Sequence, residues 1–392
     1  MRRIAICLAT AVTMVTATAC ASQLPENPVP RTQPAAQAKF AVTEVTNKLV
    51  HGWDVGFLPG GKLLVTQRPG KLALVSGTTV TTPAADFSDV FVRGESGLMG
   101  LVIKPDFEKS REFITCQARK EGTQAVDIRL VTWKLSADER TATKVGDLLT
   151  GLPVNPSGRH GGCRPTIAAD GALLVGTGDT ARATYAQDRH NLGGKVLRID
   201  VNTGKPLPDN PFISSADPKE QRIFSYGHRN VQGVAVRPGS GQVFTAEHGP
   251  DIDDELNPSV AGGNYGWDPS RGGTTPGGYD ESVPMTDTTR FPDAVRALWT
   301  TGKMTEAIAG AAFLTGKNWG ELEGRLAVVA LKGQKLLLFS LDGAGQRVTE
   351  VTVPPEFTSY GRLRAARSGP DGALYVTTSN GTNDKLLRVT PA

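Results

Sequence analysis

The sequence is poor in aromatic residues, in histidine and in long apolar runs. Aromatic residues make up 6% of the 392 residues, and the five histidines are few enough that each is a candidate functional group. Beyond the N-terminus no segment is apolar enough to cross a membrane as a helix, which excludes a protein anchored by internal membrane helices. The net charge of +4 comes without a basic cluster or stripe, so nucleic acid is not an expected partner.

Residues 1–19 have the composition of a secretion signal. A positively charged start, an apolar stretch over residues 4–15 and small residues before Cys20 follow one another in the order that such signals require. Cys20 also resembles the lipidation site of a bacterial lipoprotein, so we expect export and attachment to the cell membrane through a lipid anchor only. Ordinary signal-peptidase cleavage after Ala19 would instead leave a secreted soluble protein.

Cysteine is equally scarce, with four residues and no Cys-x-x-Cys spacing that would indicate a metal site. Cys7 leaves with the signal peptide, and Cys20 is the expected lipidation site. Cys116 and Cys163 are then two thiols in an oxidising compartment, so we predict a disulfide between them.

The remaining chain divides into a tether and one folded domain. Residues 20–39 are rich in Pro, Gln and Ala and predict a flexible linker between the anchor and the fold. Residues 40–392 consist of short β-branched runs between Gly, Pro and Asp turns, with no sustained helical period. Strands therefore dominate the folded domain.

A turn followed by an apolar strand recurs six times in the folded domain. The copies begin at Leu58, Lys104, Ala168, Arg237, Glu321 and Gly369. Several copies carry Asp-Gly or Gly-Gly, which supply the positive φ that a tight turn needs. Their irregular spacing, about 45–85 residues, indicates insertions between the strands of a propeller rather than a solenoid. We predict an all-β fold, a six-bladed β-propeller whose long loops, chiefly 202–222 and 262–300, lie on the functional face.

Two polar segments are candidates for chemistry. His160 precedes two glycines and a predicted strand, and glycine lets a ligand approach the backbone closely, although a lone histidine in a turn is more often structural. Residues 251–255 contain four acids, a density that suits a hard cation such as calcium. Their spacing is not that of an EF-hand, and a solvated acidic loop is the alternative interpretation.

An ordered set of motifs closely resembles the glucose/sorbosone dehydrogenase family, the soluble aldose sugar dehydrogenases that use pyrroloquinoline quinone (PQQ). The most specific motifs are SYGHRNVQGVAVRP (225–238), AEHGPDIDDELN (246–257) and GGNYGWD (262–268). GESGLMGLVIKPDF (94–107), RHGGCRPTIAADGALLVGTGD (159–179) and GRLRAARSGPDGALYV (361–376) support them. The resemblance covers the whole folded domain, and the leader is that expected of a lipoprotein member of the actinobacterial type.

The resemblance implies that PQQ lies in a depression on one face of the propeller. His160 stands where the family has its general base, which takes the proton of the sugar C1 hydroxyl while hydride moves to the quinone. Arg229 stands where a guanidinium polarises a quinone carbonyl. Arg229 and six further residues match cofactor-contacting positions: Glu95, Asn230, Thr305, Lys332, Arg362 and Arg364. The last three are basic and match the three cofactor carboxylates.

The resemblance also implies two calcium ions (Ca²⁺). The backbone carbonyls of Gly249 and Pro250 would complete the shell of an ion that the cofactor chelates and that acts as a Lewis acid. Glu255 and Tyr265 match a second, structural calcium site.

The chain departs from the family pattern in three places. Cys163 occupies a position that is usually Gly, and Arg159 brings a positive charge beside the expected base, where it would lower the imidazole pKa if close. The segment 304–310 lacks the usual Pro-Ser element. His228 and His248 lie inside motifs but at variable positions, so we interpret them as structural neighbours.

We therefore predict an exported quinoprotein that oxidises the C1 hydroxyl of aldose sugars to lactones and passes electrons to an external acceptor. One alternative is a catalytically silent propeller lipoprotein that serves in binding or adhesion. Another is a calcium-dependent propeller lactonase, which would need a metal held by several carboxylates at the propeller centre. The group of His160, Arg229 and the three basic residues favours the dehydrogenase.

Overall fold

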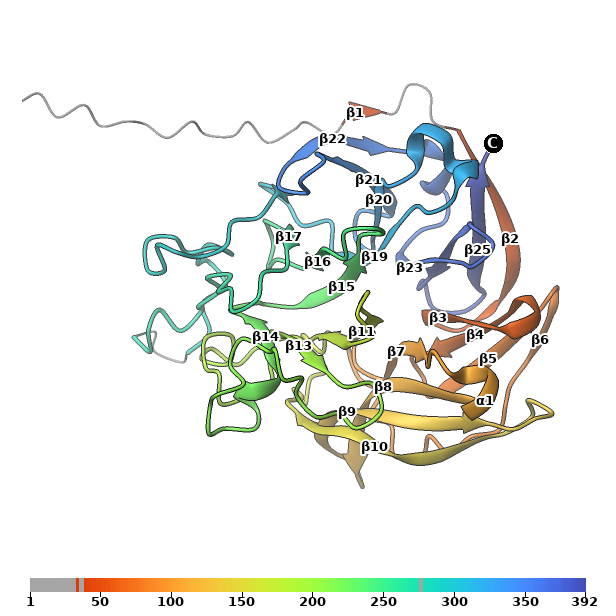
Figure 1. Cartoon of the computed structure of the whole chain (residues 1–392), viewed down its shortest axis with the longest axis horizontal. Coiled ribbons are helices and arrows are strands. Elements are labelled where there is room, and N and C mark those ends of the chain that lie inside the picture. Colours follow the sequence, from red (N-terminus) through yellow and green to blue (C-terminus); the bar gives the residue numbers. More distant parts are fainter. Residues whose placement is uncertain (1–32, 35–38, 275–277) are drawn as a thin grey trace, which may run out of the picture.

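The computed structural model describes residues 33–34, 39–274 and 278–392. The predicted signal peptide and Cys20 lie outside the described residues. The strands form six sheets arranged around a common axis (Figure 1), which confirms the six-bladed β-propeller. In the described ranges, helix is limited to α1 (Phe107–Ser110) and four short 3-10 segments, and no helix there is long and apolar enough to cross a membrane.

The blades follow one another along the chain, each with its first strand nearest the axis. Blade 1 contains β3 (Gly52–Leu58), β4 (Lys62–Gln67), β5 (Lys71–Ser76) and β6 (Thr79–Thr81). Blade 2 contains β7 (Leu98–Ile103), β8 (Glu112–Glu121), β9 (Gln124–Leu135) and β10 (Ala142–Leu152). Blade 3 contains β11 (Arg164–Ile167), β12 (Leu173–Gly176), β13 (Lys195–Ile199) and β14 (Ile223–Tyr226).

The remaining blades keep this order. Blade 4 contains β15 (Val231–Val236), β16 (Val243–Glu247), β17 (Glu255–Pro258) and β18 (Trp299–Thr300). Blade 5 contains β19 (Ile308–Phe313), β20 (Leu326–Ala330), β21 (Lys335–Leu341) and β22 (Val348–Val353), with β1 (Gln33–Pro34) parallel to β22. Blade 6 contains β23 (Leu363–Ser368), β24 (Leu374–Thr378), β25 (Asp384–Pro391) and, as its outer strand, β2 (Phe40–Leu49).

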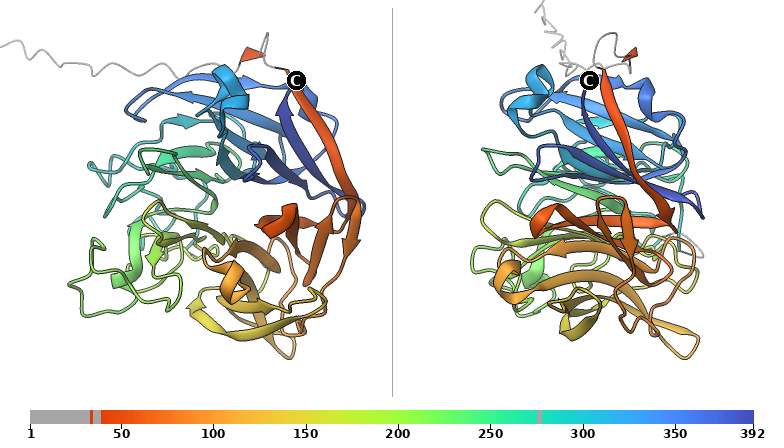
Figure 2. Two further views of the ribbon diagram at one scale, coloured as in Figure 1. Left: turned by 45° about the vertical axis from the view of Figure 1, so that its right-hand side comes forward. Right: turned by 90° about the vertical axis from the view of Figure 1, so that its right-hand side faces the viewer.

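The ring is closed by the two ends of the folded chain. β2 pairs antiparallel with β25 from Phe40 opposite Pro391 to Leu49 opposite Asp384, so the first strand of the domain completes the last blade. Figure 2 shows β2 running beside the C-terminal strand along the edge of the molecule. Hydrogen bonds between segments more than 300 residues apart thus hold the propeller together.

The six sequence repeats correspond to one structural position. Each copy supplies the turn after the first strand and the second strand of a blade, namely β4, β8, β12, β16, β20 and β24. These strands are almost completely buried, which explains their apolar runs. The strands next to the axis are the ones before the repeats, where glycine and polar residues interrupt the apolar pattern.

The predicted disulfide joins blades 2 and 3. Cys116 in β8 and Cys163, directly before β11, are bonded with a sulfur–sulfur distance of 2.02 Å. Both residues are fully buried in the cluster of apolar side chains between these two blades.

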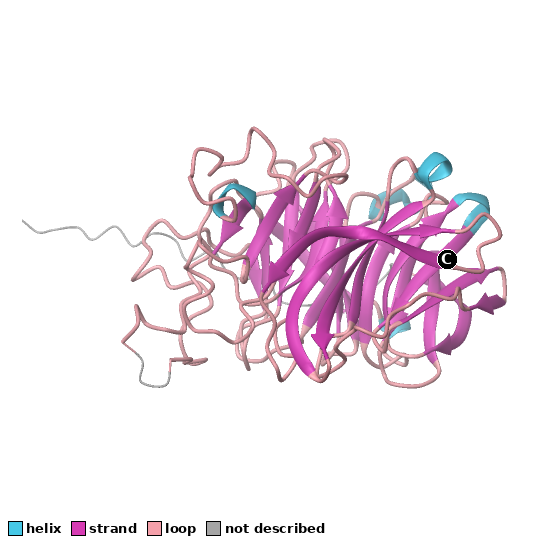
Figure 3. Ribbon diagram, turned by 90° about the horizontal axis from the view of Figure 1, so that it is seen from below, coloured by secondary structure: helices cyan, strands magenta, loops and turns pink. Residues whose placement is uncertain are grey.

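Strand direction places two sets of loops on one face. Because the strands of a blade alternate in direction, the loop before each first strand and the loop between its second and third strands emerge on the same side. Seen edge-on, the strands span the thickness of the disc and the loops gather at its faces (Figure 3). His160, Arg229 and Glu95 lie in loops of the first set, and Gly249 and Lys332 in loops of the second.

One long insertion reaches this face by a different path. Residues 259–298 connect β17 to β18, and they return along blade 3 through hydrogen bonds from Tyr265 N to Tyr226 O (2.9 Å) and from Trp267 N to Gly227 O (3.0 Å). The insertion forms much of the loop-rich edge beside blades 3 and 4 in Figure 1. It therefore contributes side chains to the face that carries His160.

Candidate active site

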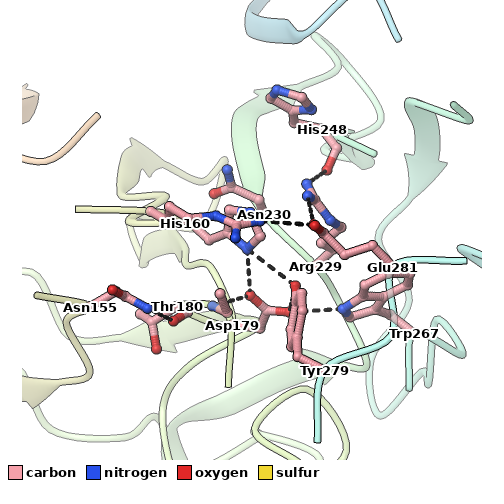
Figure 4. Close-up of polar contacts among 12 residues, drawn as sticks. Asn155, His160, Asp179, Thr180, Arg229, Asn230, His248, Trp267, Tyr279 and Glu281 are labelled. Carbon is pink, nitrogen blue, oxygen red and sulfur yellow. Dashed lines mark hydrogen bonds and ion pairs between the residues drawn. The ribbon is translucent and has the colours of Figure 1, made fainter. Parts of the chain in front are cut away.

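His160 is the centre of a buried polar network. It lies in the loop before β11 with a φ of 49°, a left-handed conformation that is uncommon for a residue with a side chain and frequent at functional sites. The residue is 5% exposed, and its Nδ1 lies 2.8 Å from Oδ1 of Asp179 (Figure 4). The histidine is thus held in a fixed orientation at the end of an inner strand.

Asp179 is the partner that the sequence did not reveal. It has no exposed surface, and its carboxylate accepts hydrogen bonds from Trp267 Nε1 (2.8 Å), Tyr279 Oη (2.8 Å) and Ala181 N (2.8 Å) as well as from the imidazole. Although burial favours the neutral acid, His160, the charge of Arg229 and the hydrogen bond from Trp267 hold the pKa of Asp179 below its usual range. An ionised Asp179 requires a proton on Nδ1 of His160, which leaves Nε2 free to accept one.

Glu95 connects three inner loops. Its carboxylate accepts from His160 N, from Asn230 Nδ2 (3.2 Å) and from Gln232 Nε2 (2.7 Å). Burial raises the pKa of Glu95, but the neighbouring His160, His248 and Arg364 and the hydrogen bond from Asn230 outweigh burial and leave the pKa lowered. Glu95, Asn230 and His160 were all predicted as site residues, and the structure brings them together.

Arg229 has two of its three nitrogens bound within the protein. Nη1 donates to His248 O (2.8 Å) and Nη2 to Oε1 of Glu281 (2.6 Å), and the side chain is 4% exposed. Nε is buried without a hydrogen-bond partner among the described residues. Burying an N–H group without an acceptor is costly, so this atom indicates a missing acceptor.

Three more buried nitrogens share this property. Within the described ranges, the unpartnered buried nitrogens are Trp53 Nε1, Arg68 Nε, Arg229 Nε and Arg364 Nε. All four are donors, and three belong to guanidinium groups. The low dielectric of the site and its cationic neighbours lower the pKa of Arg364 to about 9, with burial as the largest cause. These residues fit a polyanionic ligand such as the tricarboxylate PQQ.

The other basic residues predicted for the cofactor lie in neighbouring loops. Lys332 is exposed in the turn between β20 and β21, and Arg362 is exposed directly before β23. Arg362 affects the electrostatics of both Arg364 and Arg68, which places the three guanidinium groups near one another. Arg68 and Trp53 were missed because neither lies in a quoted motif.

Thr305 lies in a network around Asp254. Its hydroxyl donates to Oδ1 of Asp254 (2.7 Å) and accepts from Ala307 N (3.0 Å). Asp254 also accepts from Gly249 N (2.8 Å) and Glu306 N (2.7 Å), so it joins the 248–254 loop to the 301–307 loop. Asp254, one of the four acids first considered for a metal, thus binds backbone amides.

The carbonyl groups expected around the first calcium lie in the same loop. The carbonyl of Gly249 accepts from Nδ1 of His248 (2.6 Å), and Pro250 follows it in the loop between β16 and β17. A carbonyl oxygen has a second lone pair for another ligand. Within the described part of the chain no group of three or more His, Cys, Asp and Glu side chains is arranged as metal ligands.

Glu255, predicted for the second calcium, is buried beside another carboxylate. It pairs with Glu247 across β16 and β17, and Asn257 Nδ2 lies 3.1 Å from its Oε2. Burial and then Glu247 raise the pKa of Glu255 to about 8. The Tyr265 hydroxyl does not join this carboxylate; it donates to Pro258 O, while its ring stacks on His228 at 4.1 Å.

His228 occupies the structural role predicted for it. Its Nδ1 lies 2.8 Å from Oε2 of Glu247 and its Nε2 lies 2.9 Å from the hydroxyl of Ser225, with no exposed surface.

Arg159 lies close to the expected base, as its place in the sequence suggested: its Nη2 is 3.5 Å from Nε2 of His160. The same guanidinium binds Glu281 at 2.9 Å and 3.0 Å, so its charge is paired.

The propeller ring carries a buried His–Asp pair and adjacent buried donors that suit a polyanionic ligand. The sequence profile of the glucose/sorbosone dehydrogenase family matches residues 49–388, and the chain belongs to this family. It is 31% identical to the aldose sugar dehydrogenase YliI of Escherichia coli over 360 residues, 91% of this chain and 94% of that protein. The family named from the motifs is therefore confirmed.

Solved structures of relatives have the same fold and support this family assignment. The fold matches the apo-form soluble aldose sugar dehydrogenase of Escherichia coli with a TM-score of 0.77 and 29% identity, covering 90% of this chain and all of that one. It matches the PQQ-bound aldose sugar dehydrogenase of Streptomyces coelicolor with a TM-score of 0.71 and 27% identity, covering 91% and 99%. The chain is thus a member of a family of sugar-oxidising enzymes.

Proposed function

We propose that this protein is a PQQ- and calcium-dependent aldose sugar dehydrogenase that oxidises the C1 hydroxyl of aldoses to lactones. The observation that carries the proposal is the set of unpartnered buried donors on Arg68, Arg229 and Arg364 near the His160–Asp179 pair. Arg364 bonds Gln232, which bonds Glu95, and Glu95 in turn accepts from His160 N and acts on the electrostatics of Arg68. A silent propeller has no physical reason to maintain several buried Nε–H groups without acceptors, because each costs stability when no ligand satisfies it.

The residues of the chain divide into those that bind the cofactor and those that move a proton. When bound, PQQ supplies a quinone that accepts the hydride from C1. Arg364, Arg362, Lys332 and Arg68 would hold its carboxylates, and Nε of Arg229 would supply a donor that stabilises negative charge developing on the quinone. Nε2 of His160 takes the proton of the C1 hydroxyl, and Asp179 stabilises the resulting imidazolium.

The proposal includes two calcium ions, one that accompanies the cofactor and one that is structural. The carbonyl groups of Gly249 and Pro250 would bind the ion that accompanies the cofactor, and the loop between β16 and β17 places them beside Arg229 through His248. The buried carboxylates of Glu255 and Glu247 and the neighbouring Tyr265 would hold the structural ion. A cation there would relieve the repulsion of two carboxylates with little access to water.

The cellular setting follows from the leader. We propose that residues 1–19 direct export, that Cys20 carries the lipid anchor and that residues 20–39 connect it to the propeller. Electrons then leave to an acceptor outside the chain. The disulfide between Cys116 and Cys163 suits an oxidising compartment.

The lactonase alternative meets a specific difficulty at the propeller axis. The buried acid there, Asp54, is bound by Arg164 (3.0 Å) and Arg367 (2.8 Å). These two guanidinium groups neutralise the negative charge of Asp54, which is therefore not available to bind a catalytic cation at the axis. The dehydrogenase interpretation needs no cation at Asp54 and instead uses the unpartnered donors of Arg68, Arg229 and Arg364, so it is favoured.

Reconstitution tests the proposal. Purified apo-protein should acquire the absorbance of bound PQQ in the presence of calcium, lose it to a strong chelator and reduce a redox dye with a panel of aldoses. The Arg364→Gln variant serves as the matched protein with weakened cofactor binding. Absence of quinone binding at micromolar concentration would favour the silent propeller.

A further inference from the structure

The ion pair of Arg159 and Glu281 stands at the open side of the expected base. The side chains of Arg159 and Glu281 are 47% and 36% exposed, whereas those of Arg229 and Asp179 are 4% and 0% exposed. Figure 4 shows Glu281 joined to Arg229 and reaching across the site from the insertion that also carries Tyr279. The pair is accessible to a soluble ligand, and the groups behind it are not.

The position of the pair is fixed relative to the reacting atom. Nδ1 of His160 is bound to Asp179, so a substrate hydroxyl must approach Nε2. Nη2 of Arg159 lies 3.5 Å from Nε2 and donates to both carboxylate oxygens of Glu281, at 2.9 Å and 3.0 Å. Any hydroxyl that hydrogen-bonds Nε2 therefore has the guanidinium and the carboxylate as immediate neighbours.

We propose that Arg159 and Glu281 recognise the sugar hydroxyl on the carbon next to the one oxidised, an assignment that rests on the proposed dehydrogenase function. The two oxygens of a vicinal diol lie about one hydrogen-bond length apart, which is the scale of the spacing between Nε2 and the ion pair. A guanidinium only donates and a carboxylate only accepts, so together they satisfy a hydroxyl but not a methylene group. The pair thus selects sugars with a hydroxyl at C2 over 2-deoxy sugars.

The two members of the pair differ in what else they contact. Glu281 also binds Nη2 of Arg229 at 2.6 Å, whereas among the described residues Arg159 reaches Arg229 only through Glu281. Arg229 and Arg159 keep the pKa of Glu281 below its usual range even though burial works in the other direction. Replacing Arg159 therefore leaves the contact of Glu281 with Arg229 in place, whereas replacing Glu281 affects recognition and cofactor affinity together. Because Arg159 also lies 3.5 Å from Nε2 of His160, its effect on recognition is taken from the ratio between two substrates and not from turnover alone.

The test compares Arg159→Gln and Glu281→Gln with a matched control in the same insertion. Asp280 is adjacent to Glu281 and forms an exposed ion pair with Arg271 (2.6 Å), so Asp280→Asn removes a comparable pair away from His160. PQQ affinity and melting temperature are recorded for every variant. Arg159→Lys, which keeps the charge but loses the planar fork, should give an intermediate result.

Two readouts are combined. The first is calorimetric binding of 1,5-anhydroglucitol, which lacks the C1 hydroxyl and cannot be oxidised there, and of its 2-deoxy counterpart to the reconstituted protein. The second is the ratio of kcat/KM for glucose to that for 2-deoxyglucose. We expect Arg159→Gln to weaken binding of the 2-hydroxy probe by about 10- to 100-fold, to lower the kcat/KM ratio by a similar factor, and to leave the deoxy ligands nearly unchanged.

The outcomes separate the inference from the function on which it rests. If Arg159→Gln weakens both probes equally, or neither, or if Asp280→Asn has the same effect, the recognition role is wrong. If the wild-type protein binds PQQ but no aldose reduces it, the dehydrogenase function itself fails and the inference fails with it. Because both variants alter one recognition element, their effects on the kcat/KM ratio should not add in the double variant.

Discussion

Nδ1 of His160 lies 2.8 Å from Oδ1 of Asp179, a carboxylate with no exposed surface that also binds Trp267 and Tyr279. The four groups come from blade 3 and from the long insertion of blade 4, so the orientation of the imidazole depends on the docking of that insertion. This hydrogen bond keeps the proton on Nδ1 and leaves Nε2 as the basic atom.

Asp179→Asn should lower turnover by about 10²–10⁴-fold, because an amide at this position no longer stabilises the imidazolium and can favour the wrong tautomer. PQQ affinity should change little. Asp188→Asn is a matched control, since Asp188 lies in the same loop but bonds Asn191 at 3.0 Å. A steady-state dye assay in which Asp179→Asn keeps wild-type kcat would contradict the assigned role.

Arg364→Gln should weaken PQQ binding by about 10- to 100-fold, because a charge-assisted contact and a buried cation are lost together. The measurement is an absorbance titration of apo-protein with PQQ at fixed calcium. Arg388→Gln, on the outer side of the same blade where Arg388 bonds Asp371 (2.9 Å), provides the control. Equal affinities in the two variants would remove Arg364 from the cofactor site.

Asp54→Asn should destabilise the fold by about 3–5 kcal/mol, since it leaves Arg164 and Arg367 buried with reduced charge compensation. Burial opposes ionisation of Asp54, but Arg367 and then Arg164 prevail and lower its pKa. A carboxyl whose pKa is lower in the folded state stabilises the protein fully above its unfolded pKa and loses that contribution as pH falls toward the folded value.

Urea unfolding of wild type and Asp54→Asn between about pH 3 and pH 7 measures this contribution. The difference between the two proteins should be largest near pH 7 and should shrink below about pH 4. Asp89→Asn, which removes an exposed partner of Arg119 at 3.7 Å, should change little at any pH. A pH-independent difference between wild type and Asp54→Asn would contradict the ion-pair explanation.

Glu255→Gln should reduce the calcium-dependent part of the melting temperature even without PQQ, because the second calcium would be bound by the buried carboxylates of the folded state only. A ligand that binds only the folded protein at 100 times its dissociation constant adds about 2.7 kcal/mol. PQQ affinity should remain comparatively intact, since the other calcium uses carbonyl groups. Calorimetry that detects no calcium binding to apo-protein would exclude the second site.

Much of the fold was predictable because its signals are local. In five of the six blades the turn before the second strand has a glycine at positive φ, as in Gly60-Gly61 or Asp371-Gly372, whereas before β8 the positive φ falls on Arg111. The apolar strands after these turns are buried between blades and need no special partner. The pairing of Phe40 with Pro391 leaves no such signal, because it depends on closure of the whole ring.

The site was predictable only where loop and strand boundaries fix a residue near the axis. His160, Glu95, Arg229 and Asn230 directly precede inner strands, so the topology brings them together. Asp179 lies in the last position of the quoted GTGD segment, but nothing local shows that it faces His160.

The remaining site residues that the sequence did not reveal lie in the insertion between β17 and β18. Tyr279 and Glu281 were missed because their contacts with Asp179 and Arg229 depend on how residues 259–298 fold back onto blade 3. Those residues have no regular period, and their path is set by hydrogen bonds such as the one between Trp267 N and Gly227 O. The polar, glycine-rich composition predicted a functional loop but could not identify its functional side chains.

The most direct test of the account mixes reconstituted protein anaerobically with glucose and follows the absorbance of bound PQQ in a stopped-flow instrument, for wild type and His160→Asn. The account predicts rapid reduction in the wild type and equal PQQ affinity in the variant, with a reduction rate about 10²–10⁴-fold lower. Reduction of bound PQQ at the wild-type rate in His160→Asn would contradict the assignment of His160 as the base.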